Sequence, residues 1–240
     1  MRRIIEYFDQ TYIINLRDRT DRKAGCIKEF ERIGMPAPSG NVKFYTSDRP
    51  LEQGSFPSIG SRGSYTSHQR VLELAIEANA QSLLVVEDDI LFKSITRQHE
   101  DQLLEFLSKG QWDVFYFGYL EPRDTGLKGP IADWTVPTIG GHFYGVNGGF
   151  IRTMAAYMQE CQGRPQGHPL GGPTFRDGAY NNVRLLNPDL RLYLAVPNLG
   201  AQRSSRTDLP KLQFYDRHRL LRPIVNQLRS LKNSLRRLTD

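Results

Sequence analysis

Three adjacent carboxylates, Glu87-Asp88-Asp89, directly follow the apolar run Leu83 to Val86. Like charges this close repel one another unless something neutralises them. A hard divalent cation with oxygen ligands is the simplest neutraliser, and on an extended chain Glu87 and Asp89 point to the same side. The pattern therefore predicts a metal site at Glu87 and Asp89. A solvated acidic loop after a buried strand is the alternative interpretation.

The elements around the acids predict an α/β fold. A continuous apolar run such as Leu83 to Val86 is typical of a strand covered on both faces. Tyr12 to Leu16 predicts an earlier strand, followed by a helix that ends at Gly34. Strands and helices alternate from Tyr12 to Gly118, which favours a mostly parallel sheet flanked by helices. The carboxyl ends of its strands form one rim, where ligands gather in such sheets.

The loop after the first strand is rich in arginine, with Arg17, Arg19 and Arg22. Folds of this kind place a nucleotide there, and guanidinium groups suit phosphate oxygens. A solvated basic loop is the alternative.

The second half of the chain offers weaker signals. Residues 140–151 are dense in glycine and aromatics, which is compatible with close backbone approach to a ligand or with a plain tight hairpin. Asp177 lies at a loop-to-helix boundary, so it is a catalytic base or a helix N-cap. His68 falls on the apolar face of a predicted helix, and we interpret it as a structural or supporting residue.

Composition limits the class of protein. With 240 residues and 39% apolar content, the chain is long enough for one substantial core. Cys26 and Cys161 belong to no paired-cysteine motif, which favours reducing cytosol. No stretch approaches the ~20 apolar residues of a membrane span.

Positive charge is concentrated at the C-terminus. Residues 215–240 hold seven Lys/Arg against two Asp, a net +5 of the chain's +6. The rest is near neutral, which argues against a nucleic-acid partner. We expect one domain over 1–212 and a basic amphipathic helix over 213–240, which rests on an anionic membrane surface or docks on the domain.

Several segments resemble glycosyltransferase family 25, the lipooligosaccharide galactosyltransferase-like enzymes related to collagen galactosyltransferases. The most specific resemblance is in the first half of the chain. The matching segments, in chain order, are 12–22, 63–68, 84–90, 141–151 with Asp177, and 193–208.

The resemblance implies a GT-A-like, Rossmann-like fold and an inverting, metal-dependent transfer of a hexose, galactose or glucose. The donor would be a nucleotide sugar such as a UDP-hexose, and the acceptor a glycan of lipopolysaccharide or surface polysaccharide synthesis. Glu87 and Asp89 would hold Mn²⁺ or Mg²⁺, and Asp177 would be the base. Contacts with the nucleotide would come from Asn15, Arg17, Arg19, Glu87 and Asp88.

One departure from the family motivates an alternative. The segment Gly145-Val146-Asn147-Gly148-Gly149 stands where the family tends toward Thr/Ala-Tyr. A catalytically inactive domain that binds glycan or nucleotide is therefore the second hypothesis. We expect a cytoplasmic protein, either soluble or peripheral on the inner face of the membrane.

Overall fold

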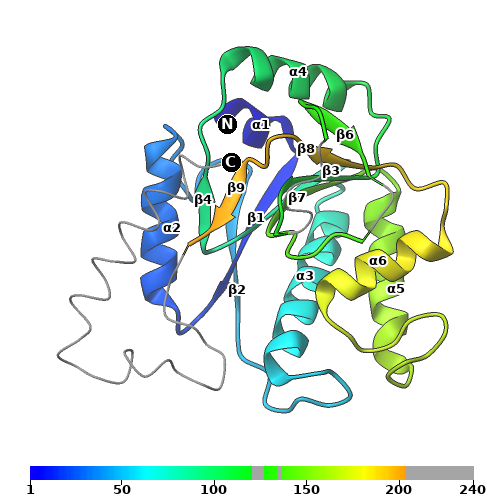
Figure 1. The fold of residues 1–240 in the computed structure, drawn as a ribbon. Coiled ribbons are helices and arrows are strands. Elements are labelled where there is room, and N and C mark those ends of the chain that lie inside the picture. The colour runs from blue at the N-terminus through cyan, green and yellow to red at the C-terminus, as the bar shows by residue number, and fades with distance from the viewer. Residues whose placement is uncertain (121–126, 135–136, 204–240) are drawn as a thin grey trace.

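A seven-stranded mixed sheet forms the centre of the protein (Figure 1). The computed structural model describes residues 1–120, 127–134 and 137–203. The strand order is β2-β1-β3-β7-β5-β8-β6. The strands are β1 (Gln10–Leu16), β2 (Val42–Ser47), β3 (Ser82–Glu87), β5 (Val114–Gly118), β6 (Ile131–Asp133), β7 (Phe143–Asn147) and β8 (Leu192–Ala195).

The sheet is mostly parallel, as predicted. β1 pairs in parallel with β2 and β3, and β5 pairs in parallel with β8. Two strands run the other way: β7 lies antiparallel between β3 and β5, and β6 lies antiparallel to β8. The carboxyl ends of β1, β3, β5 and β8 therefore meet at one rim.

Helices cover both faces of this sheet (Figure 1). On one face lie α3 (Ile59–Glu77), α5 (Phe150–Gly163) and α6 (Arg176–Leu186). On the other lie α1 (Arg2–Tyr7), α2 (Thr20–Arg32) and α4 (Arg97–Ser108). A small second sheet pairs β4 (Ile90–Phe92) with β9 (Gly200–Gln202) in antiparallel register.

β3 is the buried strand that the apolar run predicted. Leu83 and Val85 pack into the core on the α3 face, and Leu84 and Val86 pack into the core on the α2 face. All four side chains are fully buried. This double burial holds the carboxyl end of β3 in a fixed position.

The glycine-rich segment is not a plain hairpin, because β7 inserts between β3 and β5. Its glycines make room for aromatic rings. A Cβ at Gly145 would lie 2.7 Å from the Phe8 ring, and one at Gly141 would lie 2.6 Å from the Tyr116 ring. At these two positions, side-chain packing explains the glycine without any ligand.

Two further sequence predictions concern the end of α2 and the C-terminal segment 213–240. α2 gives way to Gly34, whose φ of 73° is the left-handed conformation expected after a helix. The predicted C-terminal helix over 213–240 lies outside the described residues. Within the part that is described, no helix has both the length and the apolar composition to cross a membrane.

Truncation of one β3 side chain tests how strongly this strand is anchored. Leu84→Ala is expected to lower the free energy of unfolding by ~2–5 kcal/mol, because it opens a cavity in a core without access to water. Urea unfolding measures this loss. Leu51→Ala is the matched control, since Leu51 is 98% exposed and its truncation should leave the midpoint unchanged. Equal midpoints for the two variants would contradict the assigned burial.

Candidate functional site

The acidic triplet lies where β3 ends and the chain turns toward β4. Glu87 is the last residue of β3, and Asp88 and Asp89 form the turn before Ile90. The sequence analysis assumed an extended chain through all three acids. The structure instead has a turn at Asp88 and Asp89. Glu87 contacts residues of α3, α6 and β9, whereas Asp88 and Asp89 both contact Arg22 of α2.

Asp88 joins the ends of two neighbouring strands. Its Oδ2 accepts a hydrogen bond from Asn15 Nδ2 at 2.7 Å, and its Oδ1 accepts one from Arg22 at 3.2 Å. Asn15 also donates to the main-chain oxygen of Arg19 at 3.2 Å. Burial raises the pKa of Asp88. Asn15 thus binds the turn and the start of α2 together, and its predicted nucleotide contact stays a prediction.

Asp89 is the carboxylate with an unsatisfied oxygen. Its Oδ2 lies 3.1 Å from Arg22 Nη1, while its Oδ1 is buried and has no hydrogen-bond partner. Burial, reinforced by repulsion from Glu87, raises the pKa of Asp89 to about 7. An oxygen in this position is stabilised by a proton or by a cation.

Glu87 has the opposite electrostatic character. Its Oε2 accepts a hydrogen bond from Gln202 at 3.0 Å, and its Oε1 lies 3.5 Å from His68 Nε2 and 3.6 Å from Arg176. Burial alone would raise its pKa, but the hydrogen bond with His68 and the charge of Arg176 outweigh that and lower the pKa to about 2. Glu87 is therefore ionised at any physiological pH.

His68 is a supporting residue, as predicted. Its ring is buried, its Nδ1 lies 2.8 Å from the hydroxyl of Tyr144, and Tyr180 donates to that hydroxyl at 3.2 Å. Burial lowers the pKa of His68, so the ring stays neutral. The row of His68, Tyr144 and Tyr180 supports the Glu87 carboxylate from α3, β7 and α6.

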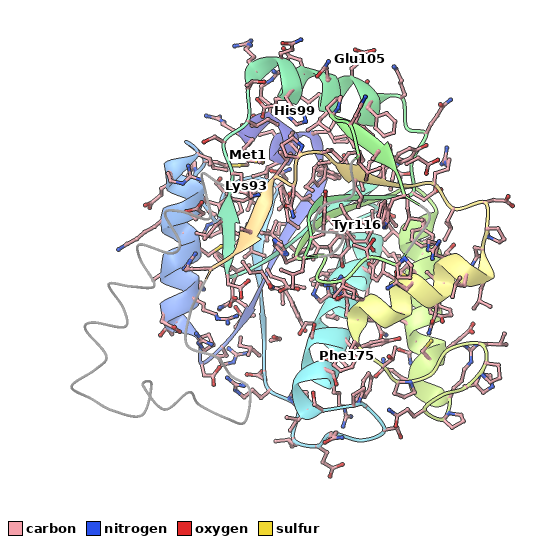
Figure 2. All side chains as sticks on the ribbon, in the orientation of Figure 1. Met1, Lys93, His99, Glu105, Tyr116 and Phe175 are labelled. Atoms are coloured by element: carbon pink, nitrogen blue, oxygen red, sulfur yellow. The ribbon has the colours of Figure 1, made fainter. Side chains whose placement is uncertain are left out.

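Arg176 was not singled out from the sequence, yet it links two predicted site residues. Its guanidinium lies between Glu87 and Asp177 and 5.5 Å from the Tyr144 ring centre. A Cβ on Gly141 would contact both this guanidinium and the ring of Tyr116. Tyr116 is buried and is labelled in Figure 2. No local motif signals this role, because residues 87 and 176 approach only in the folded chain.

Asp177 lies in the first turn of α6, and the N-cap position belongs to Phe175. The N-cap alternative for Asp177 is therefore wrong. One carboxylate oxygen accepts the Gly140 N–H at 2.7 Å, and the other pairs with Arg176. The side chain retains 23% exposure, and its role as catalytic base stays a prediction.

The two predicted arginines of the loop after β1 have different surroundings. Arg17 is 67% exposed and pairs with Asp48 through two hydrogen bonds of 2.6 and 3.1 Å. Arg19 is buried and pairs with Asp21 through two bonds of 2.9 Å. Arg17 is thus accessible to a ligand, whereas Arg19 fixes the start of α2.

A divalent cation fits the site only if the substrate shares in holding it. Among residues 1–120, 127–134 and 137–203, no group of three or more His, Cys, Asp or Glu side chains is arranged to hold a metal ion. Glu87 and the unsatisfied oxygen of Asp89 offer two carboxylate ligands. Mg²⁺ is commonly held by one or two carboxylates together with substrate phosphates and water. The residues present fit that pattern.

Comparison with known proteins adds a sequence relationship. No family model matches the chain. A glycosyltransferase 25 family member of Anopheles gambiae is 29% identical over 124 residues, covering 45% of this chain and 21% of the relative. Procollagen galactosyltransferase 1 of Danio rerio is 24% identical over 136 residues, covering 46% and 21%. The chain thus spans about a fifth of the length of these curated relatives.

Among solved structures, apo-UDP-glucose pyrophosphorylase aligns with a TM-score of 0.41 and 10% identity, covering 81% of this chain and 75% of that one. The similarity to named glycosyltransferases rests on the sequence matches alone. Over somewhat less than half of its length, this chain is similar in sequence to a glycosyltransferase 25 family member and to a procollagen galactosyltransferase.

Proposed function

We propose that this protein is a metal-dependent glycosyltransferase that moves a hexose, galactose or glucose, from a nucleotide sugar such as a UDP-hexose to a glycan acceptor. The observation that carries the proposal is the buried acidic turn at the end of β3, in which Asp89 keeps one oxygen without a hydrogen-bond partner. The sequence relationship to glycosyltransferases supports it.

The proposal assigns a role to each residue at the rim. Glu87 and Asp89 would hold Mn²⁺ or Mg²⁺, which supplies positive charge for the leaving nucleoside diphosphate. Asp88 and Asn15 keep the turn in place beneath the donor. Arg17, exposed at the end of β1, is available for the nucleotide phosphates.

Transfer with inversion requires a base on the acceptor side of the sugar. We assign this role to Asp177, which is partly exposed. To take a proton, its carboxylate exchanges the Gly140 N–H or the Arg176 contact for the acceptor hydroxyl. Arg176 therefore connects the donor side of the site, at Glu87, with the acceptor side.

The proposed setting is lipopolysaccharide or surface polysaccharide synthesis in the cytoplasm, at the inner face of the membrane. The support is the net +5 charge of residues 215–240 and their leucine-rich sequence. A basic amphipathic segment binds anionic lipid through charge and buried apolar area together.

Replacement of Asp89 tests the enzyme assignment directly. Asp89→Asn should reduce Mn²⁺-dependent sugar transfer or donor hydrolysis by about a hundredfold or more, because the charge that holds the cation is lost. Mass spectrometry of reactions with a panel of nucleotide sugars measures it. Asp101→Asn is the control, since Asp101 lies on the exposed face of α4 in an ion pair with Arg3.

Two other outcomes of that screen are informative. Full activity in Asp89→Asn would rule out the assigned site. Binding of nucleotide without turnover of any donor would instead favour the catalytically inactive binding domain.

The pH dependence of metal binding follows from the two acids. Below pH 7 Asp89 is protonated and must lose a proton to bind a cation, while Glu87 stays ionised. Mn²⁺ affinity in the presence of UDP should therefore rise about tenfold per pH unit up to about pH 7 and level off above it. Calorimetric titrations from about pH 5.5 to about pH 8.5 measure this. A flat profile across that range would contradict the role of Asp89.

Removal of residues 215–240 separates membrane binding from catalysis. The shortened protein should sediment less with anionic vesicles, because the positive charge and the leucines of residues 215–240 are removed. It should hydrolyse donor at the rate of the whole chain, because the acidic turn is kept. Neutral vesicles are the control. Undiminished binding to anionic vesicles would exclude the membrane role of this segment.

A further inference from the structure

Arg22 neutralises two of the three acids with a single nitrogen. Its Nη1 lies 3.2 Å from Asp88 Oδ1 and 3.1 Å from Asp89 Oδ2. Asp88 has a second donor in Asn15, whereas Arg22 is the one side-chain partner described for Asp89 within residues 1–120, 127–134 and 137–203. Arg22 is therefore the ion-pair partner of Asp89, while the charge of Arg203 favours the ionised carboxylate without an ion pair.

A divalent cation at Asp89 would compete with this contact. The free oxygen of Asp89 belongs to the same carboxylate that Arg22 occupies. A cation bound there would lie within a few ångströms of the guanidinium, where like charges repel strongly. Binding of the cation to the Asp89 carboxylate should therefore weaken the ion pair of that carboxylate with Arg22, and the ion pair should weaken cation binding.

Arg22 is more exposed than Arg19 and Arg176, the two other arginines that lie at this site in ion pairs. Its side chain is 22% exposed, and its Nε has no hydrogen-bond partner. Arg19 and Arg176 are both buried, and each is paired with an adjacent acid. Release of Arg22 from Asp89 breaks one ion pair and leaves the contact between Asp88 and Asn15 intact.

The first turn of α2 offers a destination for an anion. Arg22 is the third residue of that helix, which begins soon after the carboxyl end of β1, and its guanidinium contacts the acidic turn. Helix N-termini favour anions, and the planar guanidinium matches phosphate oxygens. Arg22 contacts Asp89, whose other oxygen is buried and unsatisfied, so a cation and a diphosphate would be bound close together there.

We propose that Arg22 is the built-in counter-ion of Asp88 and Asp89 before the donor binds, and that it leaves Asp89 and pairs with the donor's diphosphate when a divalent cation is held there. This inference rests on the proposed function for its second half only. The first half, competition between Arg22 and a cation, concerns the protein and the metal alone.

Three variants of the full chain test it by calorimetry, with Mn²⁺ alone and then with UDP in saturating Mn²⁺. Arg22→Gln should bind Mn²⁺ about tenfold more tightly than wild type, because a competing positive charge is gone. The same variant should bind UDP about tenfold more weakly, because the diphosphate loses a charged donor. Arg22→Lys should match wild type for Mn²⁺ and be weaker for UDP, since lysine lacks the planar fork.

Arg49→Gln is the matched control. Arg49 makes an exposed ion pair with Asp18 of the loop after β1, so both affinities should stay at the wild-type values. Thermal melts verify that each variant is folded. If Arg22→Gln does not fold, Arg22→Lys decides, and wild-type UDP affinity in that variant would overturn the inference.

The remaining outcomes separate this inference from the proposed function. Unchanged or weaker Mn²⁺ binding in a folded Arg22→Gln protein overturns the counter-ion role, as does absence of Mn²⁺ binding in every variant. Tighter Mn²⁺ binding in Arg22→Gln, with no nucleotide bound by any variant, supports the counter-ion role and counts against the proposed function.

Discussion

Compensation of three consecutive carboxylates, one partly buried and two buried, is the constraint around which this protein is built. A charged side chain removed from water is costly unless it is paired or hydrogen-bonded. Each acid is compensated by a different part of the chain: Glu87 by His68, Arg176 and Gln202, Asp88 by Asn15 and Arg22, and Asp89 by Arg22. Correct assembly of α2, α3, α6 and β9 around β3 is therefore coupled to the electrostatics of the site.

The environments of Glu87 and Asp89 push their pKa values in opposite directions. Near Glu87, a buried cation and a histidine hydrogen bond lower the pKa to about 2. Near Asp89, burial and the charge of Glu87 raise it to about 7. Two acids two residues apart thus have different chemical roles, one permanently charged and one able to exchange a proton for a cation near neutral pH.

The antiparallel strand β7 explains how the second half of the chain reaches the rim. β7 pairs with β3 on one side and β5 on the other, which places Gly140 to His142 beside the acidic turn. His142 accepts the Glu87 N–H through its main-chain oxygen at 2.9 Å, and Gly140 donates to Asp177. Strand insertion thus connects the acids of the first half with α6.

Local patterns in the sequence determined β1, β3 and their helices, the double burial of Leu83 to Val86, and the placement of the acids at the carboxyl end of a strand. These follow from short-range periodicity and from the abrupt change from apolar to charged residues after Val86. The structural role of His68 was also readable from its place on an apolar helix face.

Tertiary structure alone decided the partners of those acids. Arg176 is 89 positions from Glu87 in the sequence, and Asn15 is 73 positions from Asp88, so no local pattern signals either contact. The insertion of β7 and the turn at Asp88 and Asp89 likewise depend on which strands pair. The local sequence specifies which side chains are present at the end of β3. The electrostatic environment that sets the pKa of each depends on residues brought together only by the packing of the whole sheet.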